Sequence, residues 1–452
     1  MKALLTRTLE LVEASPRIIL CVVGFVIFCV HLGWGIWFVT ASPTNMPRTP
    51  LRAEGDAYLK SFPSWDTYYE SDGAFHNRAA VGVIQTGIPR TRSGSFCDHS
   101  PIYAYFLAAC YKIGGLRLLS IAIPQAALMG ALGVMLGLTA SRLSVTGLEW
   151  TTAALTPFLL LADLDFASYV AYPGPPALLM LVFAVALFAA SRPTARNLVL
   201  FAFAMAVGIF THAAFFVVGA AAGLWLLIQV AQRKERVYLV CALMLFAVGV
   251  LKLGVALIDT SSNGKDHTRK GAQGMVWAGN NPYYEDMEWW SLWGAQRFSS
   301  PSRVLEQRFR DYLDRSGGSE RDAGVLWMRE NPLQYAKLCF IRLRAELGPF
   351  TSNATFPRRV LCLFHWILVF PAGGYGLWRA RRTAFGLLAI LIVVILVIFD
   401  SLVFMSTRYR LPAEMVLTVF AGLTYARCLQ AWTGFKPGEP RRPDEVLPAR
   451  CF

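Results

Sequence analysis

The sequence predicts an all-α polytopic membrane protein, a bundle of about 10–12 transmembrane helices with two large extracytoplasmic loops that carry amphipathic helices. Of 452 residues, 55% are hydrophobic and only 16% are charged, and the mean hydropathy is +0.44. These values exclude a water-soluble enzyme. Apolar runs of about 18 or more residues recur, and each is long enough to cross the hydrocarbon core as a helix. The runs lack the alternation of apolar and polar residues that a transmembrane strand requires.

The chain carries a formal net charge of +14, from 43 Lys and Arg against 29 Asp and Glu. In a soluble domain this excess would suggest a nucleic-acid partner. No such partner is expected here, because the basic residues cluster in short stretches between apolar runs, as cytoplasmic loops do under the positive-inside rule. These stretches are Lys2 and Arg7, Arg192 and Arg196, Arg233 to Arg236, Arg379 to Arg382, and Arg441 and Arg442.

The positions of the polar stretches predict the topology. The first apolar run, 18–39, is too long for the core of a signal peptide and is interpreted as the first span. The polar stretches 41–100 and 259–357 then both face outward, which requires an even number of crossings between them. About seven apolar segments lie there, so one of them does not cross, and the short segments 101–115 and 150–162 are the candidates.

The chain is therefore expected to contain four parts. They are an N-terminal transmembrane module, 1–258, which includes the first loop; the second loop, 259–357, with interfacial helices; C-terminal transmembrane helices, 358–432; and a cytoplasmic tail, 433–452. The apolar segments are expected near 118–140, 166–190, 197–210, 213–231, 237–258, 359–378, 384–405 and 411–430. No internal repeat is present, which disfavours an inverted-repeat transporter. The nine cysteines show no zinc or disulfide spacing.

The first loop contains the first candidate for chemistry. The sequence predicts a short helix over 72–86 that begins at Ser71 or Asp72 and ends at Gly87. Asp72 and His76 are four residues apart and so share one face of this helix. A carboxylate beside an imidazole could remove a proton from an acceptor hydroxyl. The alternative is that Asp72 only caps the helix and favours its positive end.

A second candidate follows in the same loop. Arg90 and Arg92 precede His99 and a helix that starts at Pro101. Guanidinium groups and a helix N-terminus both suit a phosphate, because they supply charge-assisted hydrogen bonds to its oxygens. The arginines could instead be solvated loop charges near lipid headgroups.

The strongest signal lies between the last two spans, where Arg408, Tyr409 and Arg410 precede an apolar run. An arginine near the middle of the membrane costs on the order of 3 kcal/mol, so such residues usually face a cavity or a partner. Snorkelling to the membrane interface is the alternative for arginines at a span end.

The second loop divides into an aromatic part, from Gly279 to Trp293, and a helical part over 301–347 that Gly317 and Gly318 interrupt. The aromatic rings could stack on a sugar, although a belt at the membrane interface is the default interpretation. The stretch 331–344 alternates apolar and basic positions at helical spacing, and it is expected to lie flat on the membrane.

The order of these features resembles the integral-membrane GT-C glycosyltransferases, in particular the family-39-like branch that includes protein O-mannosyltransferases and the lipid A aminoarabinose transferase. The resemblance covers most of the chain and rests on the shared order and spacing of its pieces. These are Asp72, Phe75 and Ala79 before Gly87; His99 to Tyr103, followed by Gly114, Gly115 and Arg117; Gly279 and Asn280; Asn331 and Pro332; and Arg408 to Pro412.

The resemblance implies a GT-C-like helical bundle, a donor that carries one sugar on a polyprenyl phosphate, and inversion at the anomeric carbon. The acceptor is a hydroxyl of a lipid, glycan or protein, bound on the periplasmic face of a bacterial inner membrane, and no metal or other cofactor is required. Asp72 would be the general base, and Arg408, Arg410 and either His99 or Arg90 would hold the leaving phosphate. The other predicted substrate-binding residues are Glu70, His76, Arg78, Arg92, Tyr103 and Tyr409.

Several alternatives stay open. The family often has two adjacent acids where this chain has Ser71 and Asp72, so the neighbouring acids in the loop are rivals for the base. These rivals are Glu54, Asp56, Asp66 and Glu70. The alternative functions are a polymerase or ligase that uses a lipid-diphosphate-linked glycan, a transporter or flippase for a lipid or sugar, and a structural subunit of an envelope-assembly complex.

Overall fold

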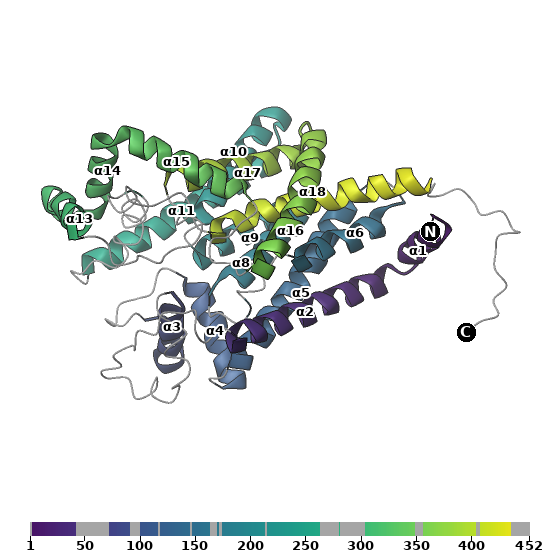
Figure 1. Ribbon diagram of the computed structural model, residues 1–452, viewed down its shortest axis with the longest axis horizontal. Coiled ribbons are helices and arrows are strands. Elements are labelled where there is room, and N and C mark those ends of the chain that lie inside the picture. Colours follow the sequence, from purple (N-terminus) through teal and green to yellow (C-terminus); the bar gives the residue numbers. More distant parts are fainter. Residues whose placement is uncertain are drawn as a thin grey trace, which may run out of the picture.

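The fold was obtained as a computed structural model, whose elements are helices (Figure 1). The structure describes residues 2–41, 72–90, 100–115, 118–144, 147–162, 170, 174–212, 215–262, 280, 303–348, 356–403 and 407–434. The helices of the N-terminal half are α1 (Lys2–Ala14), α2 (Pro16–Ala41), α3 (Asp72–Thr86), α4 (Pro101–Gly114), α5 (Leu118–Leu143), α6 (Glu149–Phe158), the 3-10 helix η2 (Leu159–Ala162), α8 (Pro176–Ala190) and α9 (Ala195–Thr211). Those of the C-terminal half are α10 (Phe215–Arg233), α11 (Arg236–Ser262), α13 (Arg303–Arg315), α14 (Glu320–Glu330), α15 (Pro332–Leu347), α16 (Phe356–Ala380), α17 (Ala384–Leu402) and α18 (Thr407–Thr433).

The protein is an all-α polytopic membrane protein. Among the described helices, six are long and apolar enough to cross a bilayer: Pro16–Ile36, Leu119–Leu143, Phe215–Arg233, Arg236–Gly254, Val360–Ala380 and Ala384–Leu402. Helices α8 and α9 are apolar but shorter, and α18 has 27 residues but includes charged ones. Beyond the six spans, the expected count of 10–12 remains a prediction.

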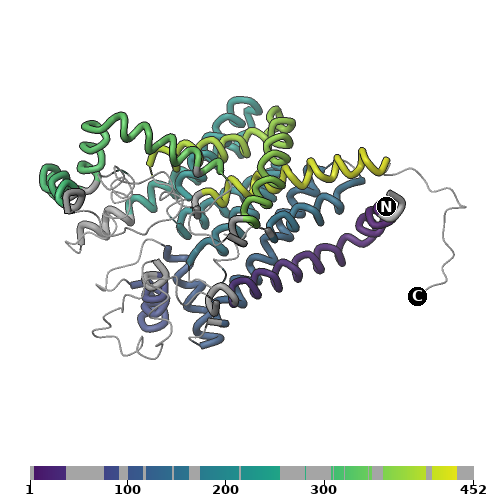
Figure 2. Tube along the Cα trace, in the orientation of Figure 1, coloured from purple at the N-terminus to yellow at the C-terminus, as the bar shows by residue number. Residues whose placement is uncertain are grey.

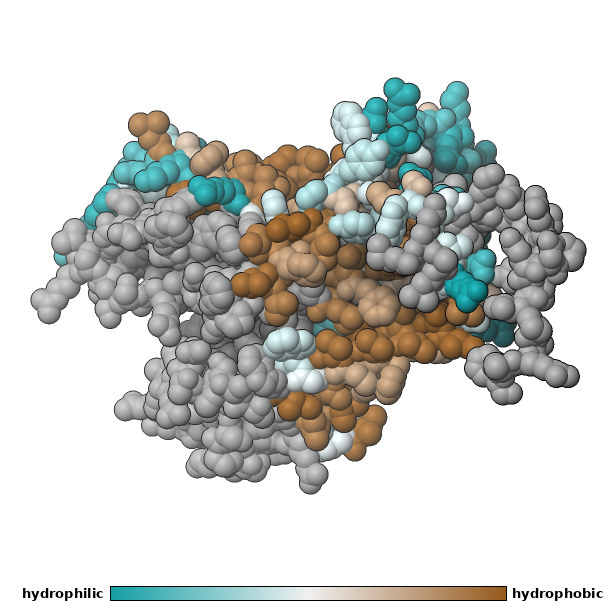
Figure 3. Space-filling model, turned by 45° about the vertical axis from the view of Figure 1, so that its right-hand side comes forward, coloured by the Kyte–Doolittle hydropathy of each residue, from teal (hydrophilic) through white to brown (hydrophobic). Residues whose placement is uncertain are grey.

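Apolar side chains form a large part of the described surface on one face. Figure 3 shows a broad hydrophobic area across the middle of one face, with hydrophilic residues gathered toward two of its upper corners. Large exposed apolar residues of the spans contribute to the surface of the molecule, among them Phe246 on α11 and Ile398 on α17. Such a surface suits hydrocarbon rather than water.

The two ends of the bundle differ in the elements that they carry. The N-terminus, α1 and the C-terminal end of α18 lie at one end, and α3 and α13 to α15 lie toward the other (Figure 1). The topology in which both termini are cytoplasmic and both loops are extracytoplasmic stays a prediction.

Both candidates for the segment that does not cross are short helices. Helices α4 and α6 have 14 and 10 residues, fewer than the roughly 20 that a full span requires, and which of the two does not cross stays a prediction. The predicted segment 166–190 is wrong at its start, because the helix α8 begins only at Pro176. A proline fits the first turn of a helix, where its missing N–H is not needed, and two prolines precede or begin this helix at positions 175 and 176.

The carboxylate of Glu13 joins α1 to α6. That carboxylate accepts hydrogen bonds from the backbone N–H of Thr151 at 2.7 Å and from its hydroxyl at 2.7 Å, and from the N–H of Trp150 at 3.2 Å. An acid at a helix N-terminus satisfies amide groups that lack partners within the helix. In the tube view, α2 continues from α1 and runs beside α5 (Figure 2).

Helix α18 lies in the centre of the bundle. It packs against α16, α17, α6, α5 and α8, and the side chains from Arg410 to Leu423 that are described are buried nearly all round the helix. A helix that is buried on every side has no solvent or lipid face, so its few polar residues need partners inside the protein.

Small residues allow α16 to approach α18 closely. A Cβ atom added at Gly376 would lie 2.6 Å from the backbone oxygen of Phe420 and 2.8 Å from Oγ1 of Thr424. At Gly374, two residues before Gly376 and on a different face of α16, an added Cβ atom would meet nothing within 4 Å.

We therefore expect Gly376→Val to destabilise the protein by about 1–3 kcal/mol, since the backbone of α18 must shift to admit the side chain. Thermal unfolding of the purified protein in detergent measures the effect. Gly374→Val is the matched control on the same helix. Its unfolding midpoint should change little, apart from the small effect of the different helix propensities of glycine and valine. Equal midpoints for the two variants would contradict the close contact.

Candidate active site

The first predicted element of the site has the expected secondary structure. Helix α3 extends over Asp72–Thr86, and Gly87 follows it with a φ of 78°, a left-handed conformation that favours glycine at the end of a helix. Asp72 is therefore the first helical residue, as predicted. Its side chain lies outside the described residues, as do Glu70, Arg92 and His99 and the rivals Glu54, Asp56 and Asp66.

One turn after Asp72, His76 is buried and packs against Tyr103 of α4. Their ring centroids are 5.3 Å apart and the ring planes are 84° from parallel, an edge-to-face contact. The Tyr103 hydroxyl in turn donates to Oε1 of Gln125 on α5 at 3.4 Å, and Nε2 of Gln125 donates to the carbonyl oxygen of Val170 at 3.1 Å. Two predicted substrate-binding residues, His76 and Tyr103, thus lie together and join α3 to the bundle.

A further hydrogen bond connects α3 with α4, because the hydroxyl of Tyr111 donates to Oδ1 of Asn77. Ala79, a residue of the motif, is buried against Ala104. These contacts fix the rotation of α3, so that Asp72 occupies a defined position at its first turn.

The remaining described residues of the first loop are more exposed. Arg90 is exposed, and its Nε donates to the hydroxyl of Thr86 at 3.3 Å. Arg78 is half-buried on α3.

At the start of α18, Arg408 and Tyr409 belong to the first helical turn, although their side chains are not among those described. Arg410 is buried, with 8% of its surface exposed. Its Nε donates to Oε1 of Glu414, one turn later, at 2.6 Å, and its Nη1 donates to the carbonyl oxygen of Gly348 at 2.9 Å. The guanidinium of Arg410 is thus committed to an ion pair on its own helix and to the end of α15.

Other buried charged groups surround this pair. They are Arg342 and Glu346 on α15 and Asp400 on α17, each at most 3% exposed. Glu346 interacts with Arg410, Glu414 and Asp400, and Asp400 interacts with both arginines. We call these five residues, Arg342, Glu346, Asp400, Arg410 and Glu414, the charged cluster. It ties α15, α17 and α18 together.

The second loop also reaches this cluster through Asn280. Oδ1 of Asn280 accepts a hydrogen bond from Nη1 of Arg342 at 3.1 Å, and Nδ2 donates to the carbonyl oxygen of Val403 at 3.3 Å. Two pieces of the motif order, Asn280 and Arg410, are therefore each hydrogen-bonded to the third, the helix that begins at Pro332, or to the residue that follows it.

Hydrogen bonds hold α15 against the neighbouring helices, and some of its apolar side chains are exposed. The hydroxyl of Tyr335 donates to the carbonyl oxygen of Leu402 at 3.0 Å, and Nε1 of Trp366 on α16 donates to that of Leu347 at 2.8 Å. Leu333 and Phe340 are 85% and 64% exposed, and they are seven residues apart, on one face. An apolar exposed face agrees with the prediction that this stretch lies along the membrane surface.

Asn331, which the sequence pairs with Pro332 in the motif, has contacts within the second loop. Its Nδ2 donates to the hydroxyl of Tyr312 at 3.1 Å and to the carbonyl oxygen of Trp327 at 2.9 Å. Tyr312, Ala323, Trp327 and Leu338 form a small apolar core among α13, α14 and α15. Asn331 therefore joins the three helices of this loop.

The charged cluster holds two guanidinium groups and three carboxyl groups, so it is neutral only when one carboxyl group is protonated. Burial raises the pKa of the Glu346 carboxyl to about 7; the guanidinium of Arg410 opposes this rise, and the carboxylate of Glu414 adds to it. Desolvation prevails because a carboxylate removed from water loses more than one nearby cation returns.

This pKa makes stability depend on pH. Glutamate in the unfolded chain has a pKa near 4.3, so between about pH 4.5 and 7 the folded state binds the extra proton. The stabilisation is fully present below the unfolded pKa and is lost as the pH rises through about 7. The Glu346→Gln variant keeps the neutral form at every pH.

We expect the free energy of unfolding of the wild type to fall between pH 5 and pH 8, with Glu346 contributing on the order of 3 kcal/mol to that fall. Glu346→Gln should remove the contribution of this group. Thermal unfolding at both pH values measures the slopes. Glu330→Gln is the control, because Arg315 and Tyr312 lower the pKa of that exposed carboxyl group, so its loss leaves the decline in place. Equal slopes for wild type and Glu346→Gln would contradict the assignment.

Most of the charged cluster was not predicted from the sequence, which pointed only to Arg410. A signal was present, because Arg410 and Glu414 are four residues apart, and so are Arg342 and Glu346. Oppositely charged residues at this spacing share one helix face. Asp400, near the end of an apolar span, is a second signal of a buried polar partner.

Metal binding has no support in the described part of the chain, where no three His, Cys, Asp or Glu side chains are grouped so as to hold an ion. The expectation that no metal is required stays a prediction.

Comparisons with known proteins give only distant similarities. No family model and no curated protein matches the sequence. Two solved structures are similar in fold. The crystal structure of ArnT from Cupriavidus metallidurans bound to undecaprenyl phosphate shares 17% sequence identity with a TM-score of 0.42, over 79% of this chain and 56% of that one. The archaeal oligosaccharyltransferase AglB from Archaeoglobus fulgidus, in complex with an inhibitory peptide and a dolichol-phosphate, shares 13% identity with a TM-score of 0.44, over 80% of this chain and 48% of that one. The chain thus spans about half the length of these two proteins.

Proposed function

We propose that the protein is a membrane glycosyltransferase of the GT-C kind that moves one sugar from a polyprenyl phosphate to an acceptor hydroxyl on the extracytoplasmic face. The observation that carries the proposal is the gathering of α3, the second-loop helices and the charged cluster toward the end of the bundle opposite α1 and the last turns of α18 (Figure 1). This gathering supports the proposal that the candidate base and the candidate phosphate ligands act on the same side of the membrane.

The proposed reaction is a single displacement. The carboxylate of Asp72 takes the proton of the acceptor hydroxyl while the acceptor oxygen attacks the anomeric carbon. The bond from that carbon to the phosphate oxygen breaks, and the polyprenyl phosphate leaves with the electron pair. Attack from the face opposite the leaving group inverts the anomeric centre. His76, one turn further along α3, and Tyr103 behind it hold the helix that carries Asp72.

The two arginines of α18 are given different roles. Arg410 donates to Glu414 and Gly348, so its contribution is to hold the first turn of the helix in place. Arg408 lies on that turn, and we assign it to the departing phosphate, whose charge grows as the bond breaks. Preorganised cations at such a position lower the barrier, because they need no rearrangement when the charge develops.

The substrates are proposed only by class. The acceptor is a lipid, glycan or protein hydroxyl, and the location is a bacterial inner membrane with the reaction on its periplasmic side. A donor with a sugar on a polyprenyl diphosphate, as a polymerase or ligase would use, is the competing possibility.

The deciding experiment incubates the purified, reconstituted protein with polyprenyl-phosphate sugars and a membrane extract as acceptor source, and measures the polyprenyl phosphate released. The monophosphate donor should react and the matched diphosphate donor should not. Arg408→Gln should lower the apparent donor affinity while the protein unfolds at the wild-type midpoint, whereas Arg410→Gln should lower the midpoint.

Each other outcome excludes the proposal in a different way. Turnover of the diphosphate donor alone would indicate a polymerase or ligase. Movement of intact lipid across vesicles without release of polyprenyl phosphate would indicate a flippase. No turnover of any lipid-linked sugar would leave a structural subunit as the better interpretation.

A further inference from the structure

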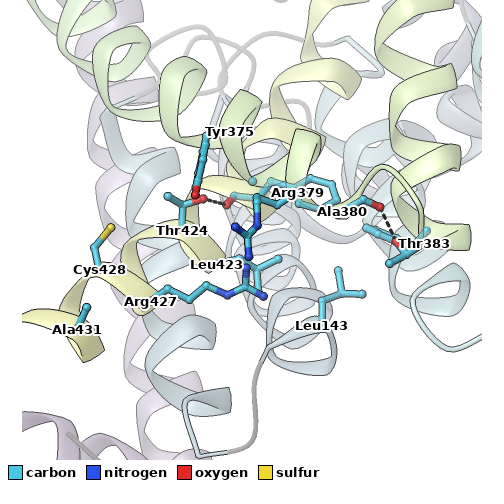
Figure 4. Close-up of a pocket in the computed structure, with 13 residues that line it drawn as sticks. Leu143, Tyr375, Arg379, Ala380, Thr383, Leu423, Thr424, Arg427, Cys428 and Ala431 are labelled. Atoms are coloured by element: carbon cyan, nitrogen blue, oxygen red, sulfur yellow. Dashed lines mark hydrogen bonds between the residues drawn. The ribbon is translucent and has the colours of Figure 1, made fainter. Parts of the chain in front are cut away.

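A pocket lies at the end of the bundle that carries the last turns of α18, far along this helix from Arg410. It has a volume of about 440 Å³ and is formed by the C-terminal parts of α16 and α18, the start of α17 and the end of α5. Figure 4 shows Arg379 from α16 and Arg427 from α18 extending toward one another in this pocket, which we call the arginine pocket.

Within the part of the chain that the structure describes, the guanidinium groups of Arg379 and Arg427 have no acidic partner, and neither forms an ion pair or a hydrogen bond. Two like charges that converge in a hollow repel each other unless an anion lies between them. Paired guanidinium groups bind a phosphate especially well, because each offers parallel N–H donors to its oxygens.

The helix α17 adds to this positive field. Its N-cap residue Thr383 lines the pocket, and Oγ1 of Thr383 accepts a hydrogen bond from the N–H of Gly386 at 3.0 Å. The positive end of a 19-residue helix therefore lies at the pocket wall.

The rest of the lining is apolar. Leu143, Phe385, Phe420 and Leu423 form part of the wall, and Tyr375 lies beside Thr424 (Figure 4). The Thr424 hydroxyl already donates its hydrogen bond within the protein, shared between the carbonyl oxygens of Ala372 and Phe420, both at 2.9 Å. A ligand must therefore combine a charged group at the arginines with hydrocarbon along these side chains.

The location fits the headgroup level of the cytoplasmic leaflet. The turn after α16 contains Arg381 and Arg382, a basic stretch that the positive-inside rule assigns to the cytoplasm. The guanidinium carbon of Arg381 lies 4.0 Å from the ring centroid of Trp378, and Trp378 is 63% exposed, as in an aromatic belt at the membrane interface. Basic pockets between transmembrane helices on this side suit anionic lipid headgroups.

We propose that the arginine pocket binds the phosphate of an anionic phospholipid of the cytoplasmic leaflet, with the acyl chains along its apolar wall. The site is on the opposite membrane side from the proposed glycosyl transfer and does not depend on that activity.

The test uses native mass spectrometry of the purified full-length protein after removal of lipid. Phosphatidylglycerol should be retained in preference to phosphatidylcholine with the same acyl chains. The double variant Arg379→Gln with Arg427→Gln should weaken retention of phosphatidylglycerol on the order of 30-fold, to the level of phosphatidylcholine, since each arginine near an anionic surface contributes about fivefold. Ala431→Trp, which narrows the pocket and keeps both arginines, should also weaken retention.

The matched control is Arg196→Gln with Arg382→Gln, which removes two exposed cytoplasmic charges that do not line the pocket. This control should retain phosphatidylglycerol nearly as well as the wild type, and thermal unfolding should show all variants folded. Equal loss in the control would mean general attraction of basic loops and would overturn the site. Displacement of the lipid by millimolar inorganic phosphate would overturn the lipid as occupant.

Discussion

Asp72→Asn is expected to lower the rate of sugar transfer by about 10²- to 10⁴-fold, the range that general-base assistance contributes. Asparagine has nearly the same size and still accepts hydrogen bonds at the first turn of α3, but it cannot take the proton of the acceptor hydroxyl. Because the contacts of His76 with Tyr103 and of Asn77 with Tyr111 remain, the fold should be preserved. Donor binding should also be preserved, since the phosphate ligands are elsewhere.

The measurement is the initial rate of release of polyprenyl phosphate from a monophosphate donor, together with donor affinity and the unfolding midpoint. Asp56→Asn, Asp66→Asn and Glu70→Gln serve as matched controls, because each removes one of the rival acids in the same loop. Wild-type activity in Asp72→Asn, with loss in one of these three, would transfer the role of base to that residue. A lower midpoint without a change in rate would mean that Asp72 only caps the helix.

The largest effect on stability is expected for Glu414→Ala. This substitution leaves the guanidinium of Arg410 in a buried position without its closest anion. Removing one partner of a buried ion pair typically costs about 3–5 kcal/mol, because water cannot replace the lost partner. Glu346 and Asp400 still interact with Arg410 after the substitution, so we expect about 3 kcal/mol here. We therefore expect a large fall in the thermal unfolding midpoint, and a protein that is poorly retained in the membrane at growth temperature.

A double substitution separates this cost from loss of packing. Arg410→Met with Glu414→Leu removes both charges and keeps similar volume, and it should recover much of the stability, because replacing a whole buried pair by apolar residues is often neutral. Glu235→Ala, at an exposed acid between α10 and α11, should change the midpoint little. A double variant as unstable as Glu414→Ala would indicate that the side-chain shapes, rather than the charges, matter at this position.

Local structure in the first loop could be predicted from the sequence because its signals are local. Asp72 and Gly87 mark the two ends of α3, and the structure has the same bounds. Most of the spans could likewise be placed, since hydropathy depends only on consecutive residues. The start of α8 was predicted too early, although the proline at its first position, Pro176, is a local signal for the first turn of a helix.

The charged cluster could not be predicted because it depends on three segments that are distant in sequence. Arg342, Asp400 and Arg410 come from three different helices, and nothing in the order of residues specifies that these helices meet. The family resemblance implied that Arg410, together with Arg408, holds the phosphate. Its carboxylate partner, four residues later, favours a structural role for Arg410 and leaves Arg408 as the better candidate for the phosphate.

The burial of α18 has a consequence for biogenesis. Of the described helices it is the last to leave the ribosome, yet its neighbours α5, α6, α8, α16 and α17 all need it to fill the space between them. The earlier spans can enter the bilayer one by one, but they cannot complete their packing until this final segment arrives between them. Assembly is therefore expected to finish after insertion, and a nascent chain interrupted before residue 407 would present a polar, incompletely filled interior to quality-control proteases.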